Sequence, residues 1–158
     1  MIKEFNIEKV KTDAEELFRS GGFFCSEAIV ASIKNNITPE MPEQIISAAS
    51  GFPVGVGGAK CMCGAISGAV ISLGYFFGRT EPASSPDPKS QKCMTLAYEL
   101  QESFRKNHKG VLCCSVLTQG MDMGGNELKE HCISLTGEMA AKTAEIIARE
   151  LYVQEVPC

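Results

Sequence analysis

The stretch GFPVGVGGAKCMCGAISGAVISLGYFFG, residues 51–78, decides how the rest of the chain folds. A glycine-rich loop leads to Cys61 and Cys63, and no residue from Cys61 to Gly78 carries a charge. A helix that is apolar on nearly all sides is typical of the middle of a domain, and its glycines let neighbouring backbones approach closely. We therefore predict a central apolar helix at about 64–77, with cysteines at its N-terminal end.

Apolar residues at helical spacing, together with capping residues, predict further helices on both sides of this one. Asn6 is a favourable N-cap, and Thr38 and Asp87 each stand before a proline in the pattern that starts a helix. No stretch shows the alternation that marks a strand. We predict an all-α helical bundle in a single domain, 1–158, whose outer helices cover about 6–19, 25–35, 40–50, 89–107, 111–118 and 127–152, the last as one helix or a pair of helices.

Charge and motif patterns exclude several function classes. A net charge of −4, with no block of Lys and Arg, argues against nucleic acid as a partner. The uncharged run at 61–78 approaches the length of a membrane span, but its glycines and serines dilute the hydrophobicity and no aromatic belt or basic cluster flanks it. We expect no membrane insertion. The glycine loop matches neither GxxxxGK[ST] nor GxGxxG after a strand, which argues against a nucleotide site.

The chain contains eight cysteines among 158 residues. Its first residues form a charged amphipathic pattern without the apolar core of a signal peptide, so we expect a cytoplasmic location. Cytoplasmic thiols stay reduced unless they take part in redox or metal chemistry. The number of cysteines therefore indicates that some of them act as thiolates.

Four cysteines, Cys25, Cys63, Cys114 and Cys132, fall at or near predicted helix starts. Free N–H groups and the positive end of the helix dipole lower the pKa of a thiol in that position. If these helix ends meet, several ionised sulfurs share one cleft, where they form disulfides or bind a metal or cluster. We expect the four cysteines to line a common cleft.

The same positions carry a resemblance to a known family. In order along the chain stand Cys25-Ser-Glu-Ala, then Gly57-Gly58 before Cys63-Gly64-Ala65-x-x-Gly68, then Cys114-x-x-Leu117 and Cys132. This order, from about Cys25 to Leu151, resembles the C_GCAxxG_C_C family, a group of small bacterial or archaeal proteins classed as redox-active and often encoded near transporters. The resemblance implies that Cys25, Cys63, Cys114 and Cys132 are the catalytic redox set or the metal-ligand set.

Three functions fit this pattern. The first is a redox-active protein, either a thiol–disulfide oxidoreductase or an electron-transfer protein. It would work with a redox partner protein or a small thiol. The second is an iron–sulfur or other metal-binding protein that uses the same cysteines, with Gly57, Gly58 and Gly64 letting the backbone pass close to a cofactor. The third is a structural or accessory partner of a transporter. No CXXCH motif supports c-type haem.

The remaining candidates have simpler explanations. Cys61 and Cys113 stand beside motif cysteines, which leaves open which sulfur of each local pair reacts. Cys93 has the position of a small core residue and Cys158 that of an idle thiol on a tail. Three other polar residues are candidates. We expect His108 to be exposed at a helix end. His131 is either a ligand or a neighbour that favours the Cys132 thiolate, and Glu27 is either a proton acceptor or a carboxylate that stabilises a helix start.

Overall fold

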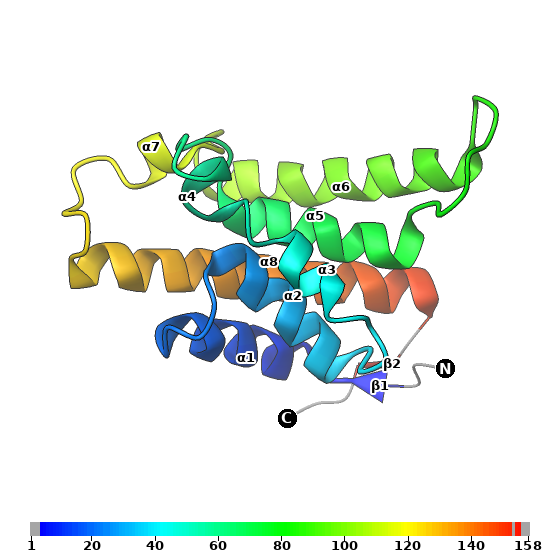
Figure 1. Cartoon of the computed structure of the whole chain (residues 1–158), viewed down its shortest axis with the longest axis horizontal. Coiled ribbons are helices and arrows are strands. Elements are labelled where there is room, and N and C mark those ends of the chain that lie inside the picture. The colour runs from blue at the N-terminus through cyan, green and yellow to red at the C-terminus, as the bar shows by residue number, and fades with distance from the viewer. Residues whose placement is uncertain (1–3, 153, 156–158) are drawn as a thin grey trace.

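A computed structural model describes residues 4–152 and 154–155, and the all-α class is confirmed (Figure 1). The described part contains the helices α1 (Ile7–Arg19), α2 (Cys25–Asn36), α3 (Gln44–Ala48), α4 (Pro53–Val56), α5 (Gly64–Phe77), α6 (Pro88–Asn107), α7 (Cys114–Leu117) and α8 (Asn126–Leu151). Two short strands, β1 (Glu4–Phe5) and β2 (Gln154–Glu155), pair in parallel. The sequence did not predict this pair, because two-residue strands show no alternation.

The predicted central helix is confirmed as α5. It contacts α2, α6 and α8, and Ala65, Ile66, Ala69 and Leu73 on it are fully buried. Among the described residues, no helix is both long enough and apolar enough to cross a membrane. The apolar character of α5 therefore reflects its place in the core, where neighbouring helices cover most of its surface.

The prediction of a helix at 40–50 places the start of this helix too early. Helix α3 begins only at Gln44, because the segment after Thr38 forms a turn in which the Met41 N–H donates to the Thr38 carbonyl at 2.9 Å. Met41 is buried in the core. Burial of this one side chain thus overrides the Thr38–Pro39 start signal and delays the helix until after Pro42.

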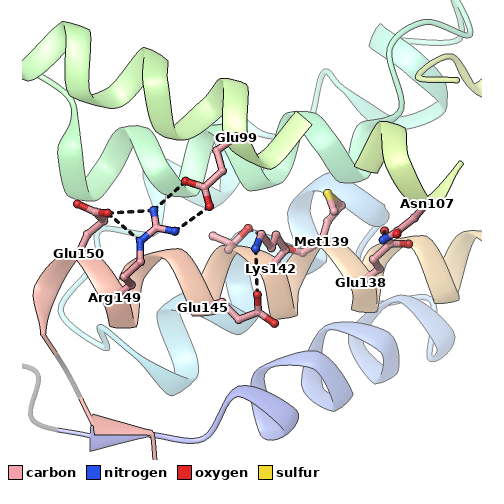
Figure 2. A network of polar contacts seen from close by, with 9 residues as sticks. Glu99, Asn107, Glu138, Met139, Lys142, Glu145, Arg149 and Glu150 are labelled. Atoms are coloured by element: carbon pink, nitrogen blue, oxygen red, sulfur yellow. Dashed lines mark hydrogen bonds and ion pairs between the residues drawn. The ribbon is translucent and has the colours of Figure 1, made fainter. Parts of the chain in front are cut away.

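The longest helix, α8, runs through the molecule beside α1, α2, α5 and α6. Figure 2 shows how it is tied to α6: both terminal nitrogens of Arg149 donate to the Glu99 carboxylate at 2.8 Å, and the Asn107 amide donates to Glu138 at 2.9 Å. The His108 Nε2 also lies 2.7 Å from the Glu138 carboxylate. We predicted that His108 is exposed, but this side chain is paired. Such half-exposed contacts add little to the free energy of unfolding on their own. Their main effect is on how the two helices align, while the apolar core supplies most of the stability.

Three short features gather at one end of the molecule (Figure 1): α4, α7 and the start of α8. The backbone there is irregular, and Val54, Val56 and Lys60 all have positive φ angles. This end of the molecule contains the cysteines of the CGAxxG segment and of α7.

Candidate functional site

The four motif cysteines line one cavity of about 600 Å³. Cys25 is the first residue of α2, Cys63 directly precedes α5, Cys114 is the first residue of α7, and Cys132 belongs to α8. These residues are up to 107 positions apart (132 − 25). The four cysteines therefore share a cleft, as predicted. Sharing a cleft does not by itself assign a chemical role to any of them.

Two loops bring Cys63 and Cys114 side by side. The Cys63 N–H donates to the Leu112 carbonyl at 2.8 Å, and the Ser115 N–H donates to the Lys60 carbonyl at 3.0 Å. A disulfide between Cys61 and Cys113 joins the same two loops. The loops thus run against each other, and the sulfur atoms of Cys63 and Cys114 lie within hydrogen-bonding reach.

The glycines of the motif allow α2 to pack directly against α5. A Cβ atom at Gly64 would lie 2.5 Å from the Cys25 Sγ, and one at Gly68 would lie 2.5 Å from the Ser26 carbonyl oxygen. Real Cβ atoms are essentially never found this close to other heavy atoms, so a side chain at Gly68 would push the helices apart and one at Gly64 would displace the Cys25 sulfur. The CGAxxG spacing therefore places the Cys25 sulfur beside the start of α5.

Gly57 and Gly58 do not line the cavity. Both have positive φ angles, of 63° and 91°, and open space faces the position of a Cβ at Gly58. Their visible role is to let the loop turn. Gly55 is the tighter position, because a Cβ there would collide with the Lys60 and Cys61 backbone.

Among the four cavity thiols, only Cys114 has a lowered pKa. The Cys63 thiol donates a hydrogen bond to the Cys114 sulfur, and this bond, with the N–H groups of Gly64 and Cys114, lowers the pKa of Cys114 from 9.0 to about 7. The same bond holds the proton on Cys63, so the pKa of Cys63 is raised, and burial raises it further. Cys63 is only 5% exposed, whereas Cys114 is partly open to the cavity.

The other two motif thiols stay protonated, which corrects the prediction of several thiolates. Burial raises the pKa of Cys25 to about 12, against the smaller lowering by N–H groups of Ser26 and Val54. Burial also raises the pKa of Cys132, and a nearby Cys114 thiolate adds to the shift. Cys132 lies beyond the first turn of α8, which begins at Asn126, so it lacks the free N–H groups of a helix start.

The remaining cysteines divide into three cases. Cys61 and Cys113 form the disulfide, a pairing that the sequence left open. Cys93 is a free thiol on α6, packed against the core and away from the cavity, in agreement with a role as a small apolar residue. Cys158 lies outside the described residues.

Glu27 and His131 are placed differently. Both carboxylate oxygens of Glu27 accept hydrogen bonds, one from the Phe24 N–H at 2.9 Å and one from the Ser50 hydroxyl at 2.6 Å, so Glu27 caps α2 although it also borders the cavity. His131 does not line the cavity. Its Nε2 atom is buried and has no hydrogen-bond partner in the described part of the chain, which gives no support to the predicted ligand role.

Whether the cavity could hold a metal ion or an iron–sulfur cluster depends on how its sulfur atoms are placed. Such groups need several deprotonated thiolates facing one point. Within residues 4–152 and 154–155, no group of three or more His, Cys, Asp or Glu side chains is placed to hold a metal ion. This arrangement of sulfurs does not fit a metal centre.

Comparison with known proteins adds one finding to this geometry. Searches among curated proteins and among solved structures found no match. A family model described as "Putative redox-active protein (C_GCAxxG_C_C)" matches residues 23–146, which include all four cavity cysteines and the whole of α5. Because this match covers most of the chain, the protein belongs to the C_GCAxxG_C_C family.

Proposed function

We propose that the protein is a thiol–disulfide redox protein in which Cys114 is the attacking residue and Cys63 the resolving residue. The observation that carries this proposal is the hydrogen bond from the Cys63 thiol to the Cys114 sulfur, which lowers the pKa of Cys114 to about 7. The thiolate is the form that attacks disulfides, and a pKa near the ambient pH is the most effective for that attack. About half of the protein molecules would then carry an ionised Cys114 thiol at pH 7.

The reaction uses two electrons. The Cys114 thiolate attacks one sulfur of a substrate disulfide, a mixed disulfide forms, and the first substrate thiolate leaves. Cys63 then gives up its proton to solvent and attacks the Cys114 sulfur, which releases the second substrate thiolate. The cysteine pair is oxidised to a disulfide and the substrate is reduced to two thiols. A redox partner protein or a small thiol restores the dithiol.

Cys25 and Cys132 belong to the same proposed site, as protonated thiols on the cavity wall. Their pKa values respond to the charge on Cys114, which means that all three sulfurs are close enough to influence one another. We assign them as further reducing equivalents that can exchange with a disulfide formed at Cys114. A cytoplasmic location is proposed with this function, because reduced thiols persist there; the link to a transporter is likewise a proposal.

The test is to oxidise the reduced protein with one equivalent of diamide and identify the linked peptides by mass spectrometry. Trypsin leaves Cys61 with Cys63, and Cys113 with Cys114, on shared peptides. The experiment therefore uses a Cys61→Ser/Cys113→Ser background. We expect a Cys63–Cys114 link that Cys63→Ser abolishes and that Cys93→Ser, the matched change outside the cavity, leaves in place.

Other outcomes would support the alternative functions. Metal bound after anaerobic purification, with visible absorbance that Cys63→Ser removes, would favour a metal or cluster protein over disulfide exchange. If Cys63→Ser and Cys93→Ser behave alike in both assays, the cavity cysteines are core residues, as expected of an accessory partner of a transporter.

A further inference from the structure

Large apolar side chains are exposed around the cavity that holds the cysteines. Phe24 is 59% exposed, Val54 42% and Met123 61%, and all three line the cavity. Deeper in the cavity lie further apolar side chains, among them Leu117, Leu128 and Leu135. An apolar recess with an exposed apolar rim is typical of a binding site, and its volume of about 600 Å³ suits a small molecule.

Two lysines line the same cavity, Lys60 and Lys129. Neither has a carboxylate partner in the part of the chain that the structure describes, whereas Lys92 and Lys142 each pair with a glutamate. The only carboxylate that borders the cavity among the described residues is Glu27, and both of its oxygens already accept hydrogen bonds. The cavity therefore presents two free cations on a chain whose net charge is −4.

We propose that this cavity selects disulfides of small apolar molecules that carry a carboxylate group. This inference rests on the proposed redox function and names its substrate class. The apolar body of such a molecule lies against Phe24 and Met123, its carboxylate faces Lys60 and Lys129, and its disulfide reaches Cys114. Polar disulfides such as oxidised glutathione lack the apolar part and are poor substrates by the same reasoning.

The experiment compares two aromatic disulfides that react with thiolates in the same way but differ in charge. The first probe, 5,5′-dithiobis(2-nitrobenzoate), carries two carboxylates, and the second, 4,4′-dithiodipyridine, is neutral. With either probe, the Cys114 thiolate forms a mixed disulfide and releases one light-absorbing product, 2-nitro-5-thiobenzoate or 4-thiopyridone, and attack by Cys63 releases the second. Stopped-flow absorbance follows the phase that Cys114→Ser removes, and the result is the ratio of the two rate constants.

We expect the Lys60→Gln/Lys129→Gln variant to lower the ratio of the anionic to the neutral probe by about tenfold at low salt. Lys106→Gln, which removes an exposed lysine on α6 outside the cavity, should leave the ratio unchanged. Because the ratio cancels any change in the reactivity of Cys114 itself, an unchanged ratio in the double variant would overturn the proposed charge selection.

The apolar part of the proposal has its own test. Met123 lies in an exposed loop, so Met123→Ser is expected to fold. It should slow both aromatic probes severalfold relative to 2-hydroxyethyl disulfide, which is small and polar. Equal slowing of all three probes, or of none, would refute the apolar contact. If no probe shows a phase that depends on Cys114, the proposed redox function fails instead, so the two failures can be told apart.

Discussion

Replacing Cys63 with alanine should make Cys114 a weaker nucleophile at neutral pH, although the reacting sulfur is untouched. In the folded protein the largest cause of the low pKa of Cys114 is the hydrogen bond from the Cys63 thiol. Burial acts in the opposite direction, and the N–H groups of Gly64 and Cys114 give smaller support. Without the thiol donor, the pKa of Cys114 should rise from about 7 to the ordinary value of 9.0 or above.

The expected size of the effect follows from two opposing factors. At pH 7, a rise in pKa from about 7 to about 9 lowers the ionised fraction from about one half to about one hundredth, roughly 50-fold. A more basic thiolate attacks disulfides faster, by about sixfold to tenfold for two pKa units. The net rate at pH 7 should therefore fall about sixfold. At pH 10 both proteins are mostly ionised, so the variant should react faster than the wild type.

The assay is the rate of reaction of Cys114 with 4,4′-dithiodipyridine between about pH 6.5 and 11, where the probe is uncharged. A neutral probe avoids any contribution from the lysines of the cavity. Cys63→Ser serves as the comparator, because its hydroxyl can still donate a hydrogen bond but cannot form a disulfide; its profile should lie between those of the wild type and Cys63→Ala. Superimposable pH profiles for the wild type and Cys63→Ala would refute the role given to the hydrogen bond.

Three further changes test the packing, the cross-link and the buried thiol. Gly68→Ala should cost about 1–3 kcal/mol in chemical denaturation, because its Cβ would overlap the α2 backbone, whereas Gly74→Ala in the same helix faces open space and should be neutral or stabilising. Cys61→Ser/Cys113→Ser should lose about 4 kcal/mol of unfolding free energy under oxidising conditions, since the disulfide closes a loop of 52 residues; stability that does not change would rule out this role for the cross-link. Because burial raises the pKa of Cys25 to about 12 from 9.0, the free energy of unfolding should fall as the pH rises from 9 to 12, as only the unfolded thiol ionises there, and Cys25→Ser should flatten that slope.

The parts of the fold that local sequence determines were predictable. The Asn6 cap accepts a hydrogen bond from the Lys9 N–H at 2.6 Å, and α5 begins and ends where its apolar run indicated. The start of α3 was not predictable, because burial of Met41 against distant residues decides it. The β1–β2 pair joins two ends of the chain that share no local pattern.

The order of the motif cysteines was enough to predict that they meet, but not how they ionise. A helix start stabilises a thiolate, yet Cys25 stands at the start of α2 and has a raised pKa, because burial outweighs the N–H groups that reach its sulfur. Burial depends on neighbours from other helices, which single-sequence patterns do not reveal. At Cys114, the hydrogen bond from Cys63 outweighs the effect of burial, so the pKa of this thiol is lowered.

The contact between Cys63 and Cys114 suggests a role for Cys61 and Cys113, the cysteines that stand beside them in the sequence. Each loop contributes two sulfurs, Cys61 and Cys63 from one and Cys113 and Cys114 from the other, and one sulfur of each loop forms the disulfide. A covalent link next to the proposed reactive pair restricts how far its two sulfurs can separate, and holding reacting groups in place is among the largest contributions a protein makes to rate. On this reasoning the Cys61–Cys113 bond is not a competitor of the Cys63–Cys114 pair. We propose that it fixes the two loops, so that the hydrogen bond which lowers the pKa of Cys114 is already formed when a substrate disulfide reaches the cavity.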